Sequence, residues 1–326
     1  MRKKIEKIYL AAIIFALVLV IFSAGCTGET GFDNSLSENS DNLTLSEKSY
    51  SVFDDAELHY ANVNGINIGY KQAGEGYPLV MVMGYATTMD AWDPSLLNSL
   101  AENYNVTIFD NRGTGYTDLG EITAENVTYE TYANDTVALM DALGIKRSYL
   151  MGWSMGTAVS EEIILKYPEK VEKAVLYAPY YNVSSSDEEY LREYLRQVAY
   201  GEANKSIVIE NMFPGDWLIC HNPDEYLPAS SETLNESGIM AAYYASLNWN
   251  GSLERLNQIE IPVLLTGGTE DVLTPPEFLR TMAGEIDGAW TAEFKGAGHG
   301  LMYQNPDGLA KTVNLFLDLD EDIRCC

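Results

Sequence analysis

The stretch Gly152-Trp153-Ser154-Met155-Gly156 has the pattern G-x-S-x-G and lies between two runs of different character. The apolar run at 148–151 before it is typical of a strand, and the run at 157–167 after it is typical of a helix. A serine on such a sharp strand-to-helix turn presents its hydroxyl, and glycines let the two backbones approach closely. Ser154 is therefore a candidate nucleophile, although an isolated G-x-S-x-G stretch also occurs as an ordinary loop.

Strands and helices are expected to alternate along most of the chain. Two short runs, 57–63 and 66–71, meet at Asn64-Gly65, a dipeptide typical of a β-hairpin. Further strands are predicted at 78–84, 106–109, 148–151, 174–177, 262–266 and 290–294, and helices at 92–103, 129–143, 157–167, 276–286 and 306–319. This alternation predicts an α/β fold with a mostly parallel sheet covered on both faces and an antiparallel edge at the hairpin.

The alternation breaks between about residues 180 and 255, where the chain is charged and aromatic. Helical spacing, as in Tyr190, Tyr194 and Val198, predicts a small helical lid inserted over the sheet. Most aromatic residues here are expected to pack in the core, but some should line a ligand cavity between lid and sheet. The candidates for this substrate pocket are Trp153, Trp217, Tyr243 and Tyr244.

Two residues near the C-terminus are the partners that a serine nucleophile requires. A histidine must take the proton of the serine, and a carboxylate must orient that histidine. Asp271 and His299 each follow a predicted strand and are flanked by glycines. Glu270 is the alternative acid, whereas His59 and His221 are expected to be structural or exposed.

The stretch Asp110 to Gly115, D-x-R-G-x-G, also follows a predicted strand. It lacks the lysine of a phosphate-binding P-loop, so a structural turn is favoured over a ligand site. In such a turn Asp110 and Arg112 can pair with each other or with nearby backbone groups.

Four motifs carry a family resemblance: the G-x-S-x-G stretch, the D-x-R-G-x-G turn, the G-x-x-D-x-x-x-P loop at Gly268 to Pro275, and G-x-G-H at Gly296 to His299. Through these motifs the chain resembles the α/β-hydrolase family over nearly all of residues 57–320. The resemblance implies a Ser154 nucleophile, a His299 base and an Asp271 orienter. It also implies an oxyanion hole made by the backbone N–H groups of Met155 and Tyr85, and no cofactor. Many relatives have His-Gly where this chain has Met83-Gly84.

The function implied by this resemblance is a serine hydrolase of carboxylic esters or related acyl compounds, acting on a small-molecule substrate. The acyl group can equally belong to a lactone, a thioester or a peptide. Some cofactor-free perhydrolases and haloperoxidases are similar in having Gly-Trp-Ser-Met-Gly, so this activity is an alternative. A non-catalytic surface binding protein on the same scaffold is the other alternative.

The N-terminus has the features of a targeting segment. Four basic residues within the first seven precede the apolar run 8–22, and Ser23-Ala24-Gly25-Cys26 follows. Residues 1–25 resemble a lipoprotein signal peptide that would leave Cys26 lipid-modified, and the alternative is an uncleaved membrane anchor. Residues 26–50 are predicted to be a disordered spacer and 51–326 the folded domain. We therefore expect an exported protein tethered to the outer face of a membrane.

Charge and cysteine content limit the possible partners. The chain has 20 basic and 48 acidic residues, a net charge of −28, which disfavours nucleic acid and anionic lipid as partners. Cys220 could form a disulfide with Cys325 or Cys326. The absence of Cys-x-x-Cys and the presence of only three histidines make a metal site unexpected. Possible glycosylation sequons begin at Asn42, Asn105, Asn126, Asn134, Asn182, Asn204, Asn235 and Asn250.

Overall fold

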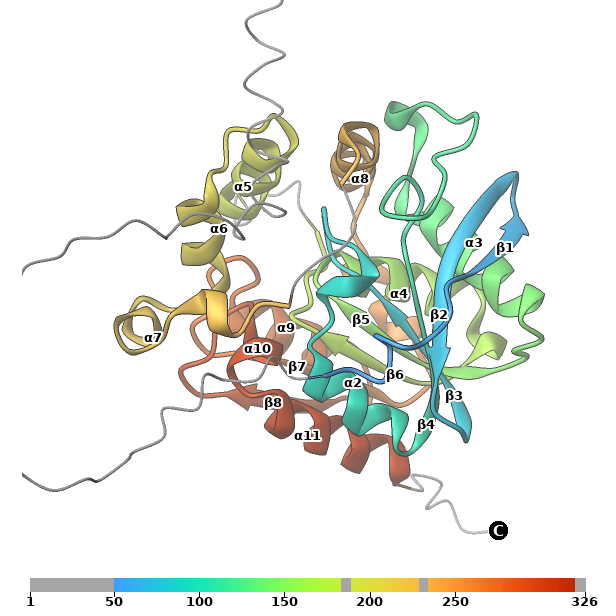
Figure 1. Ribbon diagram of the computed structural model, residues 1–326. Coiled ribbons are helices and arrows are strands. Elements are labelled where there is room, and N and C mark those ends of the chain that lie inside the picture. The colour runs from blue at the N-terminus through green and yellow to red at the C-terminus, as the bar shows by residue number, and fades with distance from the viewer. Residues whose placement is uncertain (1–49, 183–188, 229–233, 320–326) are drawn as a thin grey trace, which may run out of the picture.

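A single mixed sheet runs through the centre of the molecule (Figure 1). The computed structural model describes residues 50–182, 189–228 and 234–319. The sheet consists of β1 (His59–Val63), β2 (Ile66–Ala73), β3 (Tyr77–Val82), β4 (Tyr104–Phe109), β5 (Ser148–Trp153), β6 (Val171–Tyr177), β7 (Val263–Gly268) and β8 (Trp290–Phe294), in the spatial order β1-β2-β4-β3-β5-β6-β7-β8. The predicted signal peptide, nearly all of the spacer, and Asn42, Cys325 and Cys326 lie outside the described residues.

The pairing directions match the predicted architecture. Strands β3 to β8 pair in parallel, whereas β1 and β2 pair antiparallel with each other and β2 pairs antiparallel with β4. Asn64 and Gly65 connect β1 to β2 with φ angles of 51° and 75°, the left-handed values that this kind of two-residue turn needs. The predicted mostly parallel sheet with an antiparallel edge is therefore confirmed.

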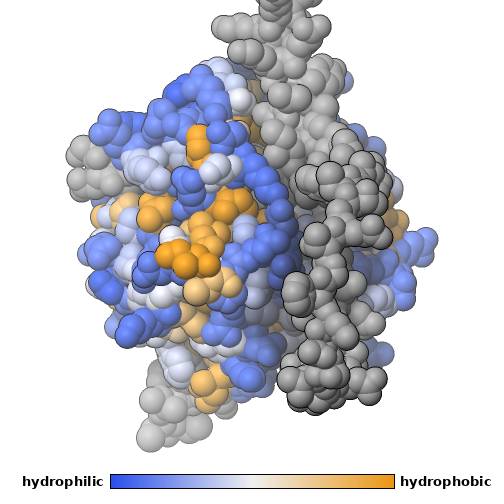
Figure 2. Space-filling view, turned by 60° about the vertical axis from the view of Figure 1, so that its left-hand side comes forward, coloured by the Kyte–Doolittle hydropathy of each residue, from blue (hydrophilic) through white to orange (hydrophobic). Residues whose placement is uncertain are grey.

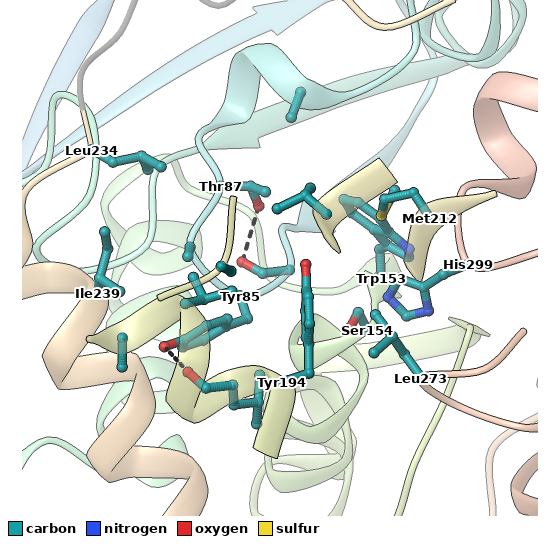
Figure 3. Close-up of a pocket in the computed structure, with 18 of the residues that line it drawn as sticks. Tyr85, Thr87, Trp153, Ser154, Tyr194, Met212, Leu234, Ile239, Leu273 and His299 are labelled. Atoms are coloured by element: carbon teal, nitrogen blue, oxygen red, sulfur yellow. Dashed lines mark hydrogen bonds between the residues drawn. The ribbon is translucent and has the colours of Figure 1, made fainter. Parts of the chain in front are cut away.

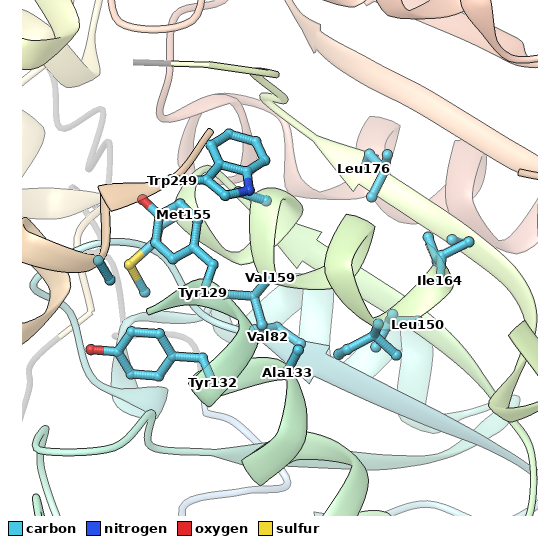
Figure 4. Close-up of a cluster of buried hydrophobic side chains, with 14 of the residues drawn as sticks. Val82, Tyr129, Tyr132, Ala133, Leu150, Met155, Val159, Ile164, Leu176 and Trp249 are labelled. Atoms are coloured by element: carbon cyan, nitrogen blue, oxygen red, sulfur yellow. The ribbon is translucent and has the colours of Figure 1, made fainter. Parts of the chain in front are cut away.

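Helices cover both faces of the sheet. The side chains of β3, which point alternately to one face and the other, show why. Leu79 and Met81 join a buried cluster with α2 (Pro94–Ala101) and α11 (Pro306–Asp318). Val80 and Val82 point to the other face and join a cluster with α3 (Tyr129–Ala142), α4 (Met155–Lys166) and α9 (Pro276–Glu285). Figure 4 shows Val82 among side chains of α3 and α4. A strand buried on both faces must be apolar at every position, as the sequence of β3 predicts.

Most predicted elements are confirmed within a few residues of their ends. The start of α2 is fixed by Asp93, whose carboxylate accepts a hydrogen bond from the Leu96 N–H at 2.9 Å. The start of α3 is fixed by Thr128, which forms a capping box with Thr131. Among the α-helices that the structure describes outside residues 180–255, α10 (Leu301–Gln304), a single helical turn that begins two residues after His299, was not predicted.

Between β6 and β7 the described chain forms four α-helices, which we call the insertion helices. They are α5 (Glu189–Ala199), α6 (Lys205–Met212), α7 (Gly215–Cys220) and α8 (Glu236–Asn248). Gly238 of α8 packs directly against Gly113, and a Cβ atom at position 238 would collide with the Gly113 carbonyl oxygen. The range predicted for the lid, about 180–255, includes these helices. Residues 183–188 and 229–233 of that range lie outside the described residues.

Candidate active site

Ser154 occupies a strained turn between β5 and α4. Its φ and ψ angles are 53° and −118°, which are rare for a residue with a side chain. Its backbone N–H donates to the Tyr177 carbonyl at 2.9 Å, so the neighbouring strand β6 holds the turn in place. Strain maintained in this way is typical of a functional residue, here one that presents a hydroxyl at the carboxyl end of a central strand.

The two glycines of the stretch are required by close backbone contacts. A Cβ atom at Gly152 would collide with the carbonyl of Gly156, and a Cβ atom at Gly156 would collide with the carbonyl of Val82. Glycine is thus the residue that lets α4 lie this close to β5 and β3.

His299 and Asp271 form a buried pair at the same edge of the sheet. His299 Nδ1 lies 2.8 Å from Asp271 Oδ2, and both side chains are almost fully buried. The Asp271 carboxylate also accepts hydrogen bonds from the backbone N–H groups of Leu273 and Thr274, each at 2.9 Å, and from the Thr274 hydroxyl at 2.8 Å. These three donors fix the orientation of the carboxylate that faces the imidazole.

The loop that carries His299 is held from two sides. Tyr177 donates its hydroxyl hydrogen to the His299 carbonyl at 2.7 Å. From the insertion, the Met212 carbonyl accepts a hydrogen bond from the Gly300 N–H at 2.8 Å. A Cβ atom at Gly298 would lie only 2.8 Å from that same Met212 oxygen and from Pro214 Cδ. The end of α6 is therefore packed directly against the histidine loop.

Ser154 and His299 line one cavity of about 200 Å³, together with Tyr85 (Figure 3). The rest of its wall is largely apolar and comes mainly from the insertion helices and the residues that follow them. It comprises Gly84, Ala86, Thr87, Ala91, Trp153, Leu191, Tyr194, Leu195, Val198, Ala199, Gly201, Ala203, Val208, Ile209, Met212, Leu227, Leu234, Glu236, Ile239, Leu273 and Tyr303. The structure thus brings Ser154 and His299 to one end of a largely apolar cavity, with Asp271 paired to His299.

The resemblance predicts an oxyanion hole from the backbone N–H groups of Met155 and Tyr85, and both residues lie near Ser154 in the structure. Met155 is the first residue of α4, and the first amides of a helix have no carbonyl partner within that helix. Tyr85 follows Gly84 in the loop after β3, and a Cβ atom at Gly84 would lie 3.5 Å from Ser154 Cβ. The loop of Tyr85 therefore passes directly over the candidate nucleophile.

The loop after β3 is braced by the D-x-R-G-x-G turn. Asp110 accepts hydrogen bonds from the N–H groups of Met89 and Tyr116, each at 2.8 Å, and Asn111 Nδ2 donates to the Met83 carbonyl at 3.0 Å. The prediction that Asp110 pairs with backbone is confirmed. Arg112 differs: besides the Leu119 carbonyl, its guanidinium forms a buried two-bond ion pair with Asp135 of α3. This partner could not be inferred from the sequence because it lies 23 positions away on another element.

Among the aromatic pocket candidates, the structure places Trp153 in the cavity wall, with its ring 5.6 Å from that of His299. Trp217 lies stacked between Phe213 and His221, with centroid distances of 4.6 and 4.4 Å. Tyr243 and Tyr244 contact each other. These three residues are not among those that line the cavity in the described part of the chain.

Several residues that shape the site were not singled out from the sequence. Thr274 holds the Asp271 carboxylate, and its position three residues after an aspartate is typical of a side-chain-to-backbone turn, which could have identified it. Tyr194 and Val198 of α5 line the cavity. Their helical spacing was visible in the sequence, but the direction in which they point was not.

The remaining acid and histidines lie away from the cavity. Glu270 is exposed, and its backbone N–H donates to the Ala297 carbonyl at 2.9 Å. His59 lies on β1 with its side chain about half exposed, 4.0 Å from Glu57. His221 stacks on Trp217, and its Nδ1 lies 2.9 Å from the Trp217 carbonyl.

Burial raises the pKa of the cavity tyrosines Tyr85, Tyr194 and Tyr303 well above the usual tyrosine range. Their hydroxyls are therefore neutral at physiological pH and contribute no negative charge to the cavity. The Tyr85 hydroxyl donates to the Leu195 carbonyl at 3.1 Å, which links the loop after β3 to α5 (Figure 3).

Within the described ranges, no group of three or more His, Cys, Asp or Glu side chains is arranged to bind a metal ion. In the same ranges, none of the helices combines the length and the apolar character needed to cross a bilayer. Cys220 is exposed, and the two cysteines proposed as its partners lie outside those ranges.

Comparison with known proteins gives one consistent family. A family model described as the alpha/beta hydrolase fold matches residues 77–306. The non-heme chloroperoxidase of Streptomyces lividans is 27% identical over 276 residues, covering 78% of this chain and 97% of the relative. The 2-hydroxy-6-oxo-6-phenylhexa-2,4-dienoate hydrolase of Comamonas testosteroni is 24% identical over 296 residues, covering 84% and 98%. The crystal structure of the enol-lactonase from Burkholderia xenovorans LB400 superposes with a TM-score of 0.68 at 22% identity, covering 80% and all of that chain, which shows the likeness of fold alone.

Proposed function

Because the chain belongs to the α/β-hydrolase fold family, we propose that it is a serine hydrolase of carboxylic esters or related acyl compounds. The observation that carries the proposal is the arrangement of three residues. Ser154 has a strained positive φ and lines the same cavity as His299. The Nδ1 atom of His299 lies 2.8 Å from the buried Asp271 carboxylate. A hydroxyl, an imidazole and a carboxylate in this relation form the usual unit for acyl transfer.

In the proposed reaction, Ser154 Oγ attacks the carbonyl carbon while His299 Nε2 takes the hydroxyl proton. The Asp271 contact at Nδ1 keeps the proton of the neutral imidazole on that nitrogen, so Nε2 is free to act as the base. The N–H groups of Met155 and Tyr85 stabilise the oxyanion, each contributing on the order of a hundredfold in rate. His299 then gives its proton to the leaving alcohol, and water hydrolyses the acyl-enzyme by the same steps.

The direct test uses p-nitrophenyl esters together with a fluorophosphonate probe that labels only activated serines. Ser154→Ala should lower kcat by roughly a thousandfold or more and abolish labelling, because the nucleophile is lost. Ser99→Ala, on α2 and outside the cavity wall, is the matched control. Turnover by Ser154→Ala at the rate of the control would refute the assignment.

A second candidate function is cofactor-free perhydrolysis or halide oxidation. The observation that favours it is the similarity to a non-heme chloroperoxidase over most of both chains. Peroxide and bromide with acetate would be assayed beside plain ester hydrolysis. Bromination that exceeds hydrolysis of the same acyl group would favour this activity. An absence of both activities and of fluorophosphonate labelling would favour a non-catalytic binding protein.

We further propose that the chain is exported and tethered at the outer face of a membrane, through a lipid on Cys26 or through an uncleaved anchor. In this proposal residues 26–50 are a spacer and residues from about 180 to 255 are a lid. The support is the basic start, the apolar run and the small-residue site that ends in cysteine. Metabolic labelling with a fatty acid should modify the wild type and not Cys26→Ser. Equal labelling of the two proteins would rule out lipidation at this cysteine.

A further inference from the structure

The wall of the active-site cavity contains a single acidic side chain, Glu236, and no lysine or arginine among its described residues. Glu236 is exposed and lies in the first turn of α8. The other ionisable groups of the wall are His299, which belongs to the proposed catalytic unit, and three tyrosines whose hydroxyls stay neutral. A negatively charged group on an acyl chain would therefore meet no lysine or arginine among the described residues of this wall.

The cavity extends away from the nucleophile toward α8. In Figure 3, Ser154, His299 and Met212 lie at one side, Tyr85 and Tyr194 in the middle, and Leu234 and Ile239 at the far side. An acyl chain attached to Ser154 would thus run past Tyr85 and Tyr194, and its free end would lie near the start of α8, where Glu236 is located.

Charge and hydration both act against an anion in this position. A carboxylate loses hydration when it enters an apolar cavity, and without a paired cation that loss is not offset. At the far end it would also face the like charge of Glu236, on a molecule whose net charge is −28. On the side of the molecule that Figure 2 brings forward, apolar residues gather within a hydrophilic surround.

We propose that this cavity selects uncharged, apolar acyl chains long enough to reach α8 and rejects chains that end in a carboxylate, with Glu236 as a specificity-determining residue. The inference rests on the proposed serine hydrolase function. It also separates this chain from the dienoate hydrolase to which it is similar, since the compound in that relative's name is a carboxylate.

The test compares two esters that differ only at the far end of the acyl chain, p-nitrophenyl octanoate and the p-nitrophenyl monoester of suberate. For the wild type, kcat/KM should favour octanoate by about tenfold or more, because the suberate carboxylate is unpaired in the cavity. Octanoate should also exceed acetate, which leaves the far end of the cavity empty.

Two variants isolate the contribution of Glu236. Glu236→Gln should reduce the octanoate-to-suberate ratio, and Glu236→Lys should reduce it further, by roughly threefold to tenfold in total, because the group is exposed and screened. The effect should be larger at low ionic strength. Glu254→Lys, outside the cavity wall, controls for the change in net charge.

The outcomes separate this inference from the function on which it rests. Equal rates for the two long esters, a ratio unchanged in Glu236→Lys, or octanoate no better than acetate would each overturn the inference while leaving the serine hydrolase intact. Failure to hydrolyse all three esters, with no fluorophosphonate labelling of Ser154, would instead overturn the proposed function itself.

Discussion

Asp271 and Glu270 are neighbours in sequence but have opposite environments. The Asp271 carboxylate is buried, contacts His299 and accepts three further hydrogen bonds, whereas Glu270 is exposed. A carboxylate can orient the imidazole only from the first of these positions. The structure therefore gives a physical reason to prefer Asp271 where the sequence left both acids open.

We predict that Asp271→Asn lowers kcat by about 10⁴-fold with little change in KM, because an amide at this position favours the wrong imidazole tautomer. Glu270→Gln, the matched control, should retain near wild-type kcat. Steady-state kinetics on a p-nitrophenyl ester measures both, and thermal unfolding checks that the variants fold. A large loss in Glu270→Gln with activity retained in Asp271→Asn would reverse the two roles.

At the level of single residues, Ser154, Asp271 and His299 could be singled out as candidates because each lies in a short motif tied to a strand end. The aromatic pocket candidates occupy different positions. Trp153 lines the cavity, whereas Trp217 stacks on Phe213 and His221. Motif spacing fixes where the backbone turns. The direction of a side chain on an insertion helix depends on how that helix packs, which spacing does not specify.

At the level of elements, α2 is capped by an aspartate, Asp93, whose pKa is raised. Burial raises the pKa of Asp93 from 3.8 to about 6, even though the Leu96 N–H donates to its carboxylate. A carboxyl group with a raised folded-state pKa binds its proton more tightly when folded. The stability contributed by that proton is present below pH 4 and is lost as the pH rises through 6.

Asp93→Asn should therefore leave the free energy of unfolding nearly unchanged at pH 4 and raise it by about 1–3 kcal/mol at pH 7. Asparagine caps a helix as well as aspartate does, and it places no charge in this buried position at pH 7. Urea unfolding at the two pH values measures the difference. Asp287→Asn, at an exposed position, is the control. Lower stability of Asp93→Asn at pH 7 would mean that the charged cap is stabilising.

The contact between α8 and the D-x-R-G-x-G turn depends on two glycines. A Cβ atom at Gly238 would collide with the Gly113 carbonyl, whereas a Cβ atom at Gly215, on α7, has no heavy atom within 4 Å. Gly238→Ala should thus lower the free energy of unfolding by roughly 1–3 kcal/mol and change the octanoate-to-acetate ratio, because α8 must move. Gly215→Ala should change neither. Identical behaviour of the two variants in thermal unfolding and kinetics would contradict this account.

The sequence predicted the sheet strands and their covering helices well because apolar periodicity is strong there, as in β3. It missed α10, since a helix of one turn carries no period. It also could not place the insertion helices. Their positions depend on particular contacts such as Gly238 with Gly113 and the Tyr85 hydroxyl with the Leu195 carbonyl, which join distant parts of the chain.

At the level of the whole molecule, a net charge of −28 means that acidic side chains repel one another in the compact state. Raising NaCl from 10 to 150 mM shortens the screening length from about 30 Å to about 8 Å. We expect the midpoint of thermal unfolding to rise by a few degrees over this range. Exposed ion pairs such as Arg196 with Glu193 would be weakened by salt, but such pairs contribute little. A fall in the midpoint would show that these pairs outweigh the repulsion.

The packing of Met212 and Pro214 against the histidine loop bears on how this protein could be modified. The Met212 carbonyl accepts a hydrogen bond from the Gly300 N–H, so a deletion that joined β6 directly to β7 would remove a support of the loop that carries His299, the proposed base, together with most of the cavity wall. The insertion is therefore not an interchangeable module. A chimera that exchanges it with that of a relative would have to keep residues 212–214 together with 298–300 as one unit.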